Sequence, residues 1–437
     1  MPNTRREFLA ASAIAGGALW LGACGGDDEE SSAGSGGGPA TGTVTFTTWG
    51  SAAEIAAIKA LVGDFERDNA GARVRLREVP FEEVRQSIDA DLEAGSAPDL
   101  FRVTYQDFGF YATNGALVDL SGALPDGYGD DFQEGFWRAV QFEDAPHGVP
   151  WHTDVSALLY NRGIFERAGI TSVPDRLEDA WTWDEFLDVS RRLRDRGGDR
   201  VSAFGMNWQE AGAYRWLNWL YAAGGRLIDE DPTKATLAGS PEALKTLEYF
   251  RTWFDERLTP RNLTPRGAYP SEVFPTQRLA MISIGDFLLP SLADTVTRFD
   301  YGATFLPRDE SAATDLGGTA IVVTRDSDRP ELAARFAAFM GSEAAQRRFI
   351  EATTTLPTRT ALVEADLDYK VAPELMPVYQ QQATTLSPEL VRATTLPNFT
   401  EVNNVFVAEL EALTSRGQDP RQTLDNMQSG VDEALQG

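Results

Sequence analysis

From about residue 43 onward, the pattern of hydrophobic and polar residues is of two kinds. Short apolar runs, such as 43–49 and 98–103, predict strands because they are rich in β-branched and aromatic residues. Elsewhere apolar residues recur every three or four positions, as in 55–65 and 81–92, and this spacing predicts helices with one buried face. Because predicted strands and helices alternate along the chain, the sequence predicts an α/β fold built around a sheet.

Local signals mark where several helices begin. Thr182 is followed three residues later by Glu185, which predicts a capping box at the start of a helix. Ser240 followed by Pro241 predicts another helix start, with a capping side chain and a proline at the first helical position. Between these two helices, residues 201–207 have the composition of a strand.

The stretch 148–161 carries the strongest candidate chemistry. It places Trp151, His152 and Asp154 directly before an apolar run, 155–160, that predicts a buried strand. An aromatic ring beside a carboxylate suits a sugar, which can stack its C–H face on the ring and donate its hydroxyl hydrogens to the carboxylate. The alternative is a strand with an ordinary flanking loop.

A second set of candidates comes from the positions at which strands end. Ligands in open α/β sheets lie beyond the carboxyl ends of the strands, which here selects Trp49, Ser51, Tyr105 and Gln106. Aromatic residues are also dense after the strand 201–207, and about half of them are expected to pack in the core. Among these aromatic residues, Trp208 is the preferred ligand contact because it directly follows the strand.

The composition limits the classes of function. The chain has 437 residues, of which 42% are hydrophobic, so it can bury a large core and form two lobes or domains. Its formal net charge of −27 makes binding to nucleic acid phosphates unfavourable. Cys24 is the single cysteine, so neither an intrachain disulfide nor a cysteine-based metal site is expected. No phosphate-binding loop, serine nucleophile elbow or zinc-protease motif is present.

The N-terminal segment has the features of an export signal. The adjacent arginines of 4–9 resemble a twin-arginine motif, and an apolar stretch, 8–20, follows them. The segment 21–24 resembles a bacterial lipobox, which implies cleavage before Cys24 and lipidation of its thiol. Residues 1–24 are therefore expected to target the protein, by the Tat route or alternatively by Sec. Residues 25–42, rich in acidic residues, glycine and serine, are expected to form a flexible tether.

Several segments together resemble the extracellular solute-binding proteins of ABC importers, most closely the carbohydrate-binding group that includes maltose-binding proteins. The resemblance extends from about residue 43 to the C-terminus, and its specificity lies in the order and spacing of the motifs. The segments that carry it are 95–100, 111–120, 150–161, 165–170, 182–186, 277–287, 316–323 and 356–359.

The resemblance implies a two-lobed periplasmic-binding-protein fold of type II character, with hinge crossings between the lobes. Residues 43–150 plus 319–352 would form lobe one, and 151–318 plus 353–437 would form lobe two. A carbohydrate would bind in the cleft between them and be delivered to the transmembrane subunits of an ABC permease. The protein would be a monomer, anchored to the membrane by lipid outside the cytoplasm, with no cofactor or metal and no enzymatic activity.

The resemblance also extends the set of candidate site residues. Asp154 stands where sugar-binding relatives carry an acidic residue, and Phe287 stands where some carry a stacking tryptophan. Asp286 and Gly318 lie in segments that the family places beside the ligand. The expected stacking residues are Trp49, Trp151, Trp208 and Phe287. The expected hydrogen-bonding residues are Ser51, Gln106 and Asp154. The remaining candidates are Tyr105, His152, Asp286 and Gly318.

Other functions remain open at this point. The same fold could bind a polyol, a phosphorylated polyol or a polyamine, since carboxylates with aromatic rings also bind amines. A secreted glycosidase would need two carboxyl groups roughly 5–10 Å apart, which Asp154 and Asp286 could supply. A surface lipoprotein with a structural role would need no ligand.

Overall fold

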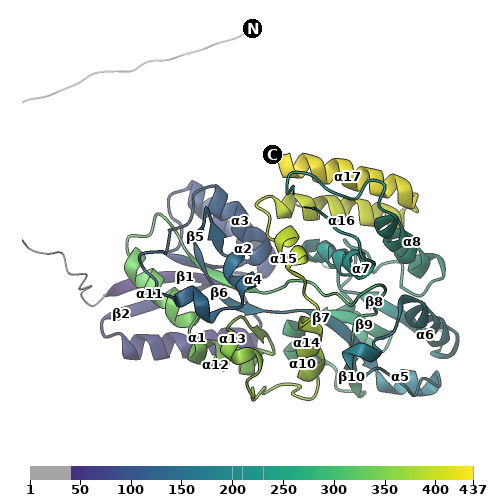
Figure 1. Ribbon diagram of the computed structural model, residues 1–437. Helices are drawn as coiled ribbons and strands as arrows, with labels where there is room; N and C mark the ends of the chain where they lie inside the picture. The colour runs from purple at the N-terminus through teal and green to yellow at the C-terminus, as the bar shows by residue number, and fades with distance from the viewer. Residues whose placement is uncertain (1–40, 199, 209, 230, 437) are drawn as a thin grey trace, which may run out of the picture. The chain divides into compact units, whose positions relative to one another are not determined.

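The structure is a computed structural model that describes residues 41–198, 200–208, 210–229 and 231–436. The predicted export signal, the lipidation residue Cys24 and all of the tether except residues 41 and 42 lie outside the described residues. The described residues form two α/β lobes, each built on its own sheet (Figure 1). In this part of the chain, every helix is too short or too polar to cross a membrane.

The first lobe is built on a six-stranded sheet. In order across the sheet, the strands are β12 (Leu356–Pro357), β6 (Gly148–Thr153), β11 (Thr319–Val323), β3 (Leu100–Thr104), β1 (Gly42–Thr48) and β2 (Ala72–Glu78). Strands β2, β1 and β3 run parallel, whereas β11 is antiparallel to both of its neighbours, β3 and β6.

Helices cover both faces of this sheet. The helices of this lobe are α1 (Ala52–Asp68), α2 (Phe81–Glu93), α3 (Tyr105–Thr113), α4 (Glu134–Arg138), α11 (Pro330–Met340), α12 (Glu343–Thr353) and α13 (Thr360–Val363); a small hairpin joins β4 (Gln141–Phe142) to β5 (Ala145–Pro146). On one face Phe46 of β1 and Phe65 of α1 pack edge-to-face on Phe336 of α11. On the other face, Phe101 of β3 packs on Tyr111 of α3.

The second lobe is built on a four-stranded sheet with an aromatic core beside it. Its strands are, in order, β10 (Tyr301–Thr304), β7 (Ser156–Asn161), β9 (Leu279–Gly285) and β8 (Ser202–Met206). Its helices are α5 (Arg162–Arg167), α6 (Trp183–Arg196), α7 (Trp216–Ala222), α8 (Pro241–Asp255), α9 (Pro270–Val273), α10 (Leu289–Thr295), α14 (Met376–Ala383), α15 (Pro388–Thr394), α16 (Phe399–Ser415) and α17 (Pro420–Gln436). Phe186 and Phe204 pack against Trp253, which in turn contacts Trp219 of α7.

The elements expected from the sequence are confirmed in position, including the capping box in which Thr182 and Glu185 bond reciprocally. Two lobe boundaries differ from the expectation. Strand β6 keeps residues 151–153 in the first sheet, because its hydrogen-bonded ladder with β11 runs to His152. Strand β12 pairs with β6, and α13 packs beside it, so 353–363 also belong to the first lobe.

A buried ion pair ties four elements of the first lobe together. Arg102 of β3 donates from Nη2 to Glu54 of α1 at 2.9 Å and from Nη1 to the carbonyl oxygen of Trp49 at 2.8 Å. The same guanidinium lies 2.7 Å from Nε2 of His152 and 3.2 Å from Oγ1 of Thr319. Burial, together with the charge of Arg102, holds the pKa of His152 well below its usual range, so His152 is neutral and accepts from the guanidinium.

Replacing Arg102 by leucine is expected to destabilise the protein by about 3–5 kcal/mol, because Glu54 would be left buried without its cation. The matched control is Arg138→Leu, which removes an exposed pair with Glu134 and is expected to change stability little. Urea unfolding of the three proteins measures the difference. Equal midpoints for the two variants would contradict a structural role for the buried pair.

Candidate functional site

The chain passes from one sheet to the other within two residues. Strand β6 ends at Thr153 and β7 begins at Ser156, so only Asp154 and Val155 separate a strand of the first lobe from a strand of the second. The segment before β11 runs alongside, because the backbone N–H of Gly317 donates to the carbonyl of Asp154 at 2.9 Å. Asp154 therefore lies at a point where two segments cross between the lobes.

The edges of both sheets meet at this crossing. On the first sheet, Trp49, Tyr105 and Asp154 follow the carboxyl ends of β1, β3 and β6. On the second sheet, Asn207 and Asp286 follow the carboxyl ends of β8 and β9. These are the ends at which open α/β sheets bind ligands, and here they face each other.

The carboxyl group of Asp154 is buried without a partner. Its residue is 6% exposed, and its side chain accepts no hydrogen bond from another residue in the described part of the chain. Burial raises the pKa of Asp154 to about 7, and the nearby Asp315 adds to this shift, whereas Arg215 and Arg102 oppose it. Burial also raises the pKa of Asp286 well above its usual range, with the charge of Asp154 adding to the effect.

Other buried polar atoms without partners gather around the same crossing. Folded proteins pair the large majority of such atoms, so a concentration of unpaired ones needs an explanation. Some unpaired atoms, including several indole nitrogens, are dispersed through the cores. Those near the crossing or at the two facing edges are Oη of Tyr105, Oγ of Ser156, both amide atoms of Asn207, Oδ1 of Asn218 and Oδ1 of Asp286.

A satisfied ion pair holds this cluster in place. Asp315 accepts from Nε of Arg215 at 3.0 Å and from Nδ2 of Asn218 at 2.8 Å. It also accepts from the backbone N–H of Ser156 at 3.1 Å, which fixes the start of β7. Sequence analysis missed this pair, although a lone arginine inside the aromatic stretch after β8 is a signal for a buried partner.

Five of the predicted site residues gather at the crossing. They share contacts with its backbone or with Asp154. Nε2 of Gln106 donates to the carbonyl oxygen of Leu316 at 2.6 Å. Oδ2 of Asp286 accepts from the N–H of Val155 at 3.3 Å. Gly318 has φ +99°, and a Cβ there would lie 2.3 Å from the carbonyl oxygen of His152. The five are Tyr105, Gln106, Asp154, Asp286 and Gly318.

Three predictions need correction. Trp151 is fully buried in the first lobe, with its ring centroid 4.2 Å from that of Phe349, so it has no free face for stacking. Trp208 is 2% exposed and packs on Phe250 in the second lobe. His152 is buried, and its Nε2 lies 2.7 Å from the guanidinium of Arg102, so this nitrogen is not available to a ligand. In each case the side chain packs into its own lobe instead of facing the other one.

The remaining candidates keep some exposure. Ser51 is the N-cap of α1, where its Oγ accepts from the N–H of Glu54 at 3.3 Å. Phe287 is half-buried, and its ring lies against Gly285, next to the carboxyl group of Asp154. Trp49 is half-buried beneath the guanidinium of Arg102, which lies 4.5 Å from the ring centroid.

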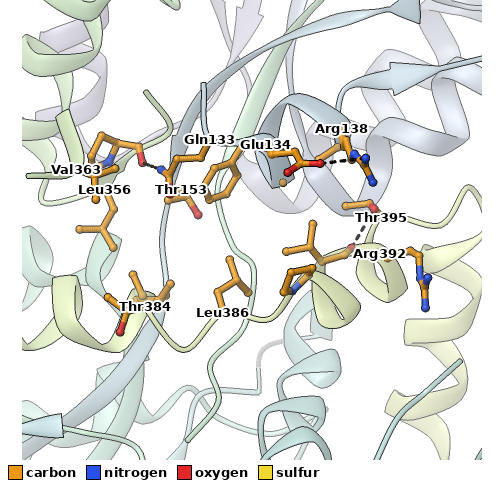
Figure 2. Close-up of a pocket in the computed structure, with 18 of the residues that line it drawn as sticks. Gln133, Glu134, Arg138, Thr153, Leu356, Val363, Thr384, Leu386, Arg392 and Thr395 are labelled. Atoms are coloured by element: carbon orange, nitrogen blue, oxygen red, sulfur yellow. Dashed lines mark hydrogen bonds and ion pairs between the residues drawn. The ribbon is translucent and has the colours of Figure 1, made fainter. Parts of the chain in front are cut away.

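A groove of about 590 Å³ opens on the other side of the crossing (Figure 2). Successive side chains of a strand point to opposite faces, so Thr153 and Val155 line this groove while Asp154 faces the polar cluster. None of the predicted site residues lines it. The other lining residues come from segments far apart in sequence, namely 133–139, 356–363 and 380–395, which is why sequence reasoning did not find the groove.

Comparison with known proteins identifies the family. The family model described as bacterial extracellular solute-binding protein matches residues 49–347. The chain belongs to this family. It is therefore an exported binding protein, as predicted, and the glycosidase alternative is set aside. The described residues contain no group of side chains that could hold a metal ion.

Curated relatives and solved structures share this architecture. The diacetylchitobiose-binding protein DasA of Streptomyces coelicolor is 24% identical over 82% of this chain and 83% of its own length. The maltodextrin-binding protein MdxE of Bacillus subtilis is 23% identical over 70% of each chain. The GacH receptor of Streptomyces glaucescens has a TM-score of 0.77 at 21% identity, over 91% of this chain and 99% of its own. These likenesses confirm the two-lobed fold.

The raised pKa of Asp154 predicts a specific pH dependence of stability. A folded-state pKa above the unfolded value means that protonation stabilises the fold at low pH, and this contribution is lost as the pH rises through about 7. Relative to Asp154→Asn, the wild-type free energy of unfolding should fall by up to about 1.4 kcal/mol per unit between about pH 4 and 7.

Denaturant unfolding at a series of pH values tests this dependence. Asp144→Asn, at an exposed position, is the control and should follow the wild type throughout. If the difference in unfolding free energy between the wild type and Asp154→Asn stayed constant over this pH range, Asp154 would be shown to stay ionised.

Proposed function

We propose that this protein is the carbohydrate-binding component of an ABC importer, holding its solute between the two lobes at the crossing that contains Asp154. Membership of the solute-binding family supports the proposal, as do relatives whose names specify diacetylchitobiose and maltodextrin. The partner would be the transmembrane part of an ABC permease.

The observation that carries this proposal is the set of unpaired polar atoms at the facing sheet edges. A sugar hydroxyl both donates and accepts, so it can bond to an acceptor such as Asp154 and to an amide such as Asn207. Pairing these atoms would recover the free energy lost when they were buried alone. The half-buried ring of Phe287 offers a flat surface beside Asp154.

The charges around the site favour a neutral solute. A phosphorylated polyol would need a free cation, but Arg215 is paired with Asp315 and Arg102 with Glu54. A polyamine would need ionised carboxylates, but burial raises the pKa of both Asp154 and Asp286. A protonated carboxyl group can donate to a hydroxyl, which suits a sugar.

Saccharide binding can be tested by thermal shift and calorimetry with mono- and oligosaccharides. A bound saccharide should raise the melting temperature of the wild type by mass action. Asp154→Asn and Asn207→Ala should each weaken binding roughly tenfold or more, because each removes hydrogen bonds made in a buried site. Thr384→Ala and Leu386→Ala, which line the groove on the other side of the crossing, are matched controls and should bind normally.

The same titrations separate the alternatives. A shift with spermidine and none with any saccharide would contradict the carbohydrate proposal. Loss of binding in the two groove variants, with normal binding in Asp154→Asn and Asn207→Ala, would place the solute in the groove instead.

We also propose that the protein is exported through its twin-arginine signal and anchored by lipid at Cys24. In a bacterium that processes lipoproteins, the wild type should be recovered with the membrane fraction. Cys24→Ala should be recovered mainly in soluble form, because the thiol that carries the lipid is absent. Equal recovery of the two proteins with membranes would contradict the anchor.

A further inference from the structure

An aromatic pair, the half-buried Trp49 and the exposed Phe81, lies at the far end of the first sheet's binding edge. Phe81, the first residue of α2, is 38% exposed, and in the described part of the chain only Val363 is a comparably exposed large apolar side chain. The ring centroid of Phe81 lies 5.4 Å from that of Trp49, with the rings tilted by 53°. The outer face of the Phe81 ring is therefore open to solvent beside the binding edge.

Arg102 holds Trp49 in place. Its guanidinium lies over the indole ring of Trp49, and it also donates to the backbone carbonyl of Trp49. The backbone N–H of Val79 donates to the carbonyl of Thr48 at 3.0 Å, which holds the segment leading into Phe81 against β1. Trp49 and the segment that leads into Phe81 are therefore held in place, which lowers the entropic cost of binding to the pair.

Phe81 lies on the side of α2 that faces the second lobe. Arg85 follows it by four residues and so shares its helix face. Arg85 lies 3.8 Å from Glu401 of α16 and 3.3 Å from Asp107 of α3. Asp107 in turn accepts from Oγ1 of Thr400 at 2.7 Å. Because Thr400 and Glu401 belong to the second lobe, this face of α2 lies where the two lobes contact each other.

The strand order gives the distance from Asp154 to this aromatic pair. Between β6, which ends beside Asp154, and β2, which leads to Phe81, lie β11, β3 and β1. Four strand spacings of about 4.8 Å each give about 19 Å along the edge. A single sugar ring is much shorter than this distance, so only a chain of several linked rings would cover it.

We propose that Trp49 and Phe81 form an outer stacking subsite, so that the protein selects oligosaccharides long enough to reach from Asp154 to Phe81. This inference rests on the proposed function and specifies its substrate class. The inner rings bind the polar cluster, and an outer ring stacks on the exposed face of Phe81. Phe81 then determines the preferred chain length without contacting the inner rings.

Affinity capture from defined mixtures tests this subsite whichever sugar the protein binds. Immobilised protein is incubated with partial hydrolysates of starch, chitin, cellulose, xylan and galactan, and mass spectrometry reads the lengths of the retained saccharides. The variants are Phe81→Ala, Phe81→Tyr, which keeps a ring, and Val363→Ala, which removes the other exposed apolar side chain. Their melting temperatures confirm folding, since both positions are exposed.

The wild type, Phe81→Tyr and Val363→Ala should retain trisaccharides and longer chains preferentially. Phe81→Ala should bind these longer chains roughly tenfold more weakly, while retaining disaccharides as the wild type does. Two results would overturn the inference while leaving the proposed function standing. One is preferential retention of mono- or disaccharides by the wild type. The other is an equal loss of short and long chains in Phe81→Ala. Retention of no saccharide by the wild type would overturn both.

Discussion

Two residues, Asp154 and Val155, join a strand of the first sheet to a strand of the second, and the rest of the site depends on this short connection. Because side chains alternate along an extended chain, the two residues point to opposite sides. Asp154 faces the polar cluster, whereas Val155 is fully buried in the wall of the groove. The hydrogen bond from Gly317 holds the second crossing segment, which runs in the opposite direction, beside the first one.

This arrangement places polar groups where water is largely excluded. The buried carboxylate of Asp315 is stabilised because its oxygens accept hydrogen bonds from Arg215, Asn218 and the backbone of Ser156. The side chains of Asp154 and Asn207 are also buried, but they have no such hydrogen-bond partners. Leaving them unpaired costs free energy in the ligand-free protein, and a hydroxyl-rich solute would restore it. A solute that pairs them only when the lobes are together would favour the closed form by its differential affinity.

The sequence predicted the scaffold better than the site. The positions of β1, α1 and β3 were predicted because each has a single, consistent hydrophobic periodicity. The start of one helix was predicted from local sequence alone, through the capping box of Thr182 and Glu185. Asp154 was found because it directly precedes a strand. The prediction that Trp151 and Trp208 contact the ligand was wrong, because a side chain near a strand end can point toward the ligand or into its own lobe. These two side chains pack on Phe349 and Phe250 in their own lobes, and both partners are distant in sequence.

The proposed binding mode requires the solute to lie against Asp154, between the facing sheet edges. A crystal structure of the protein with a saccharide recovered from it, or with the tightest binder of the panel, measures this directly. We expect sugar hydroxyls within hydrogen-bonding distance of the carboxyl group of Asp154 and the amide of Asn207. A saccharide seated in the groove formed by 133–139 and 380–395, with Asp154 still unpaired, would contradict it.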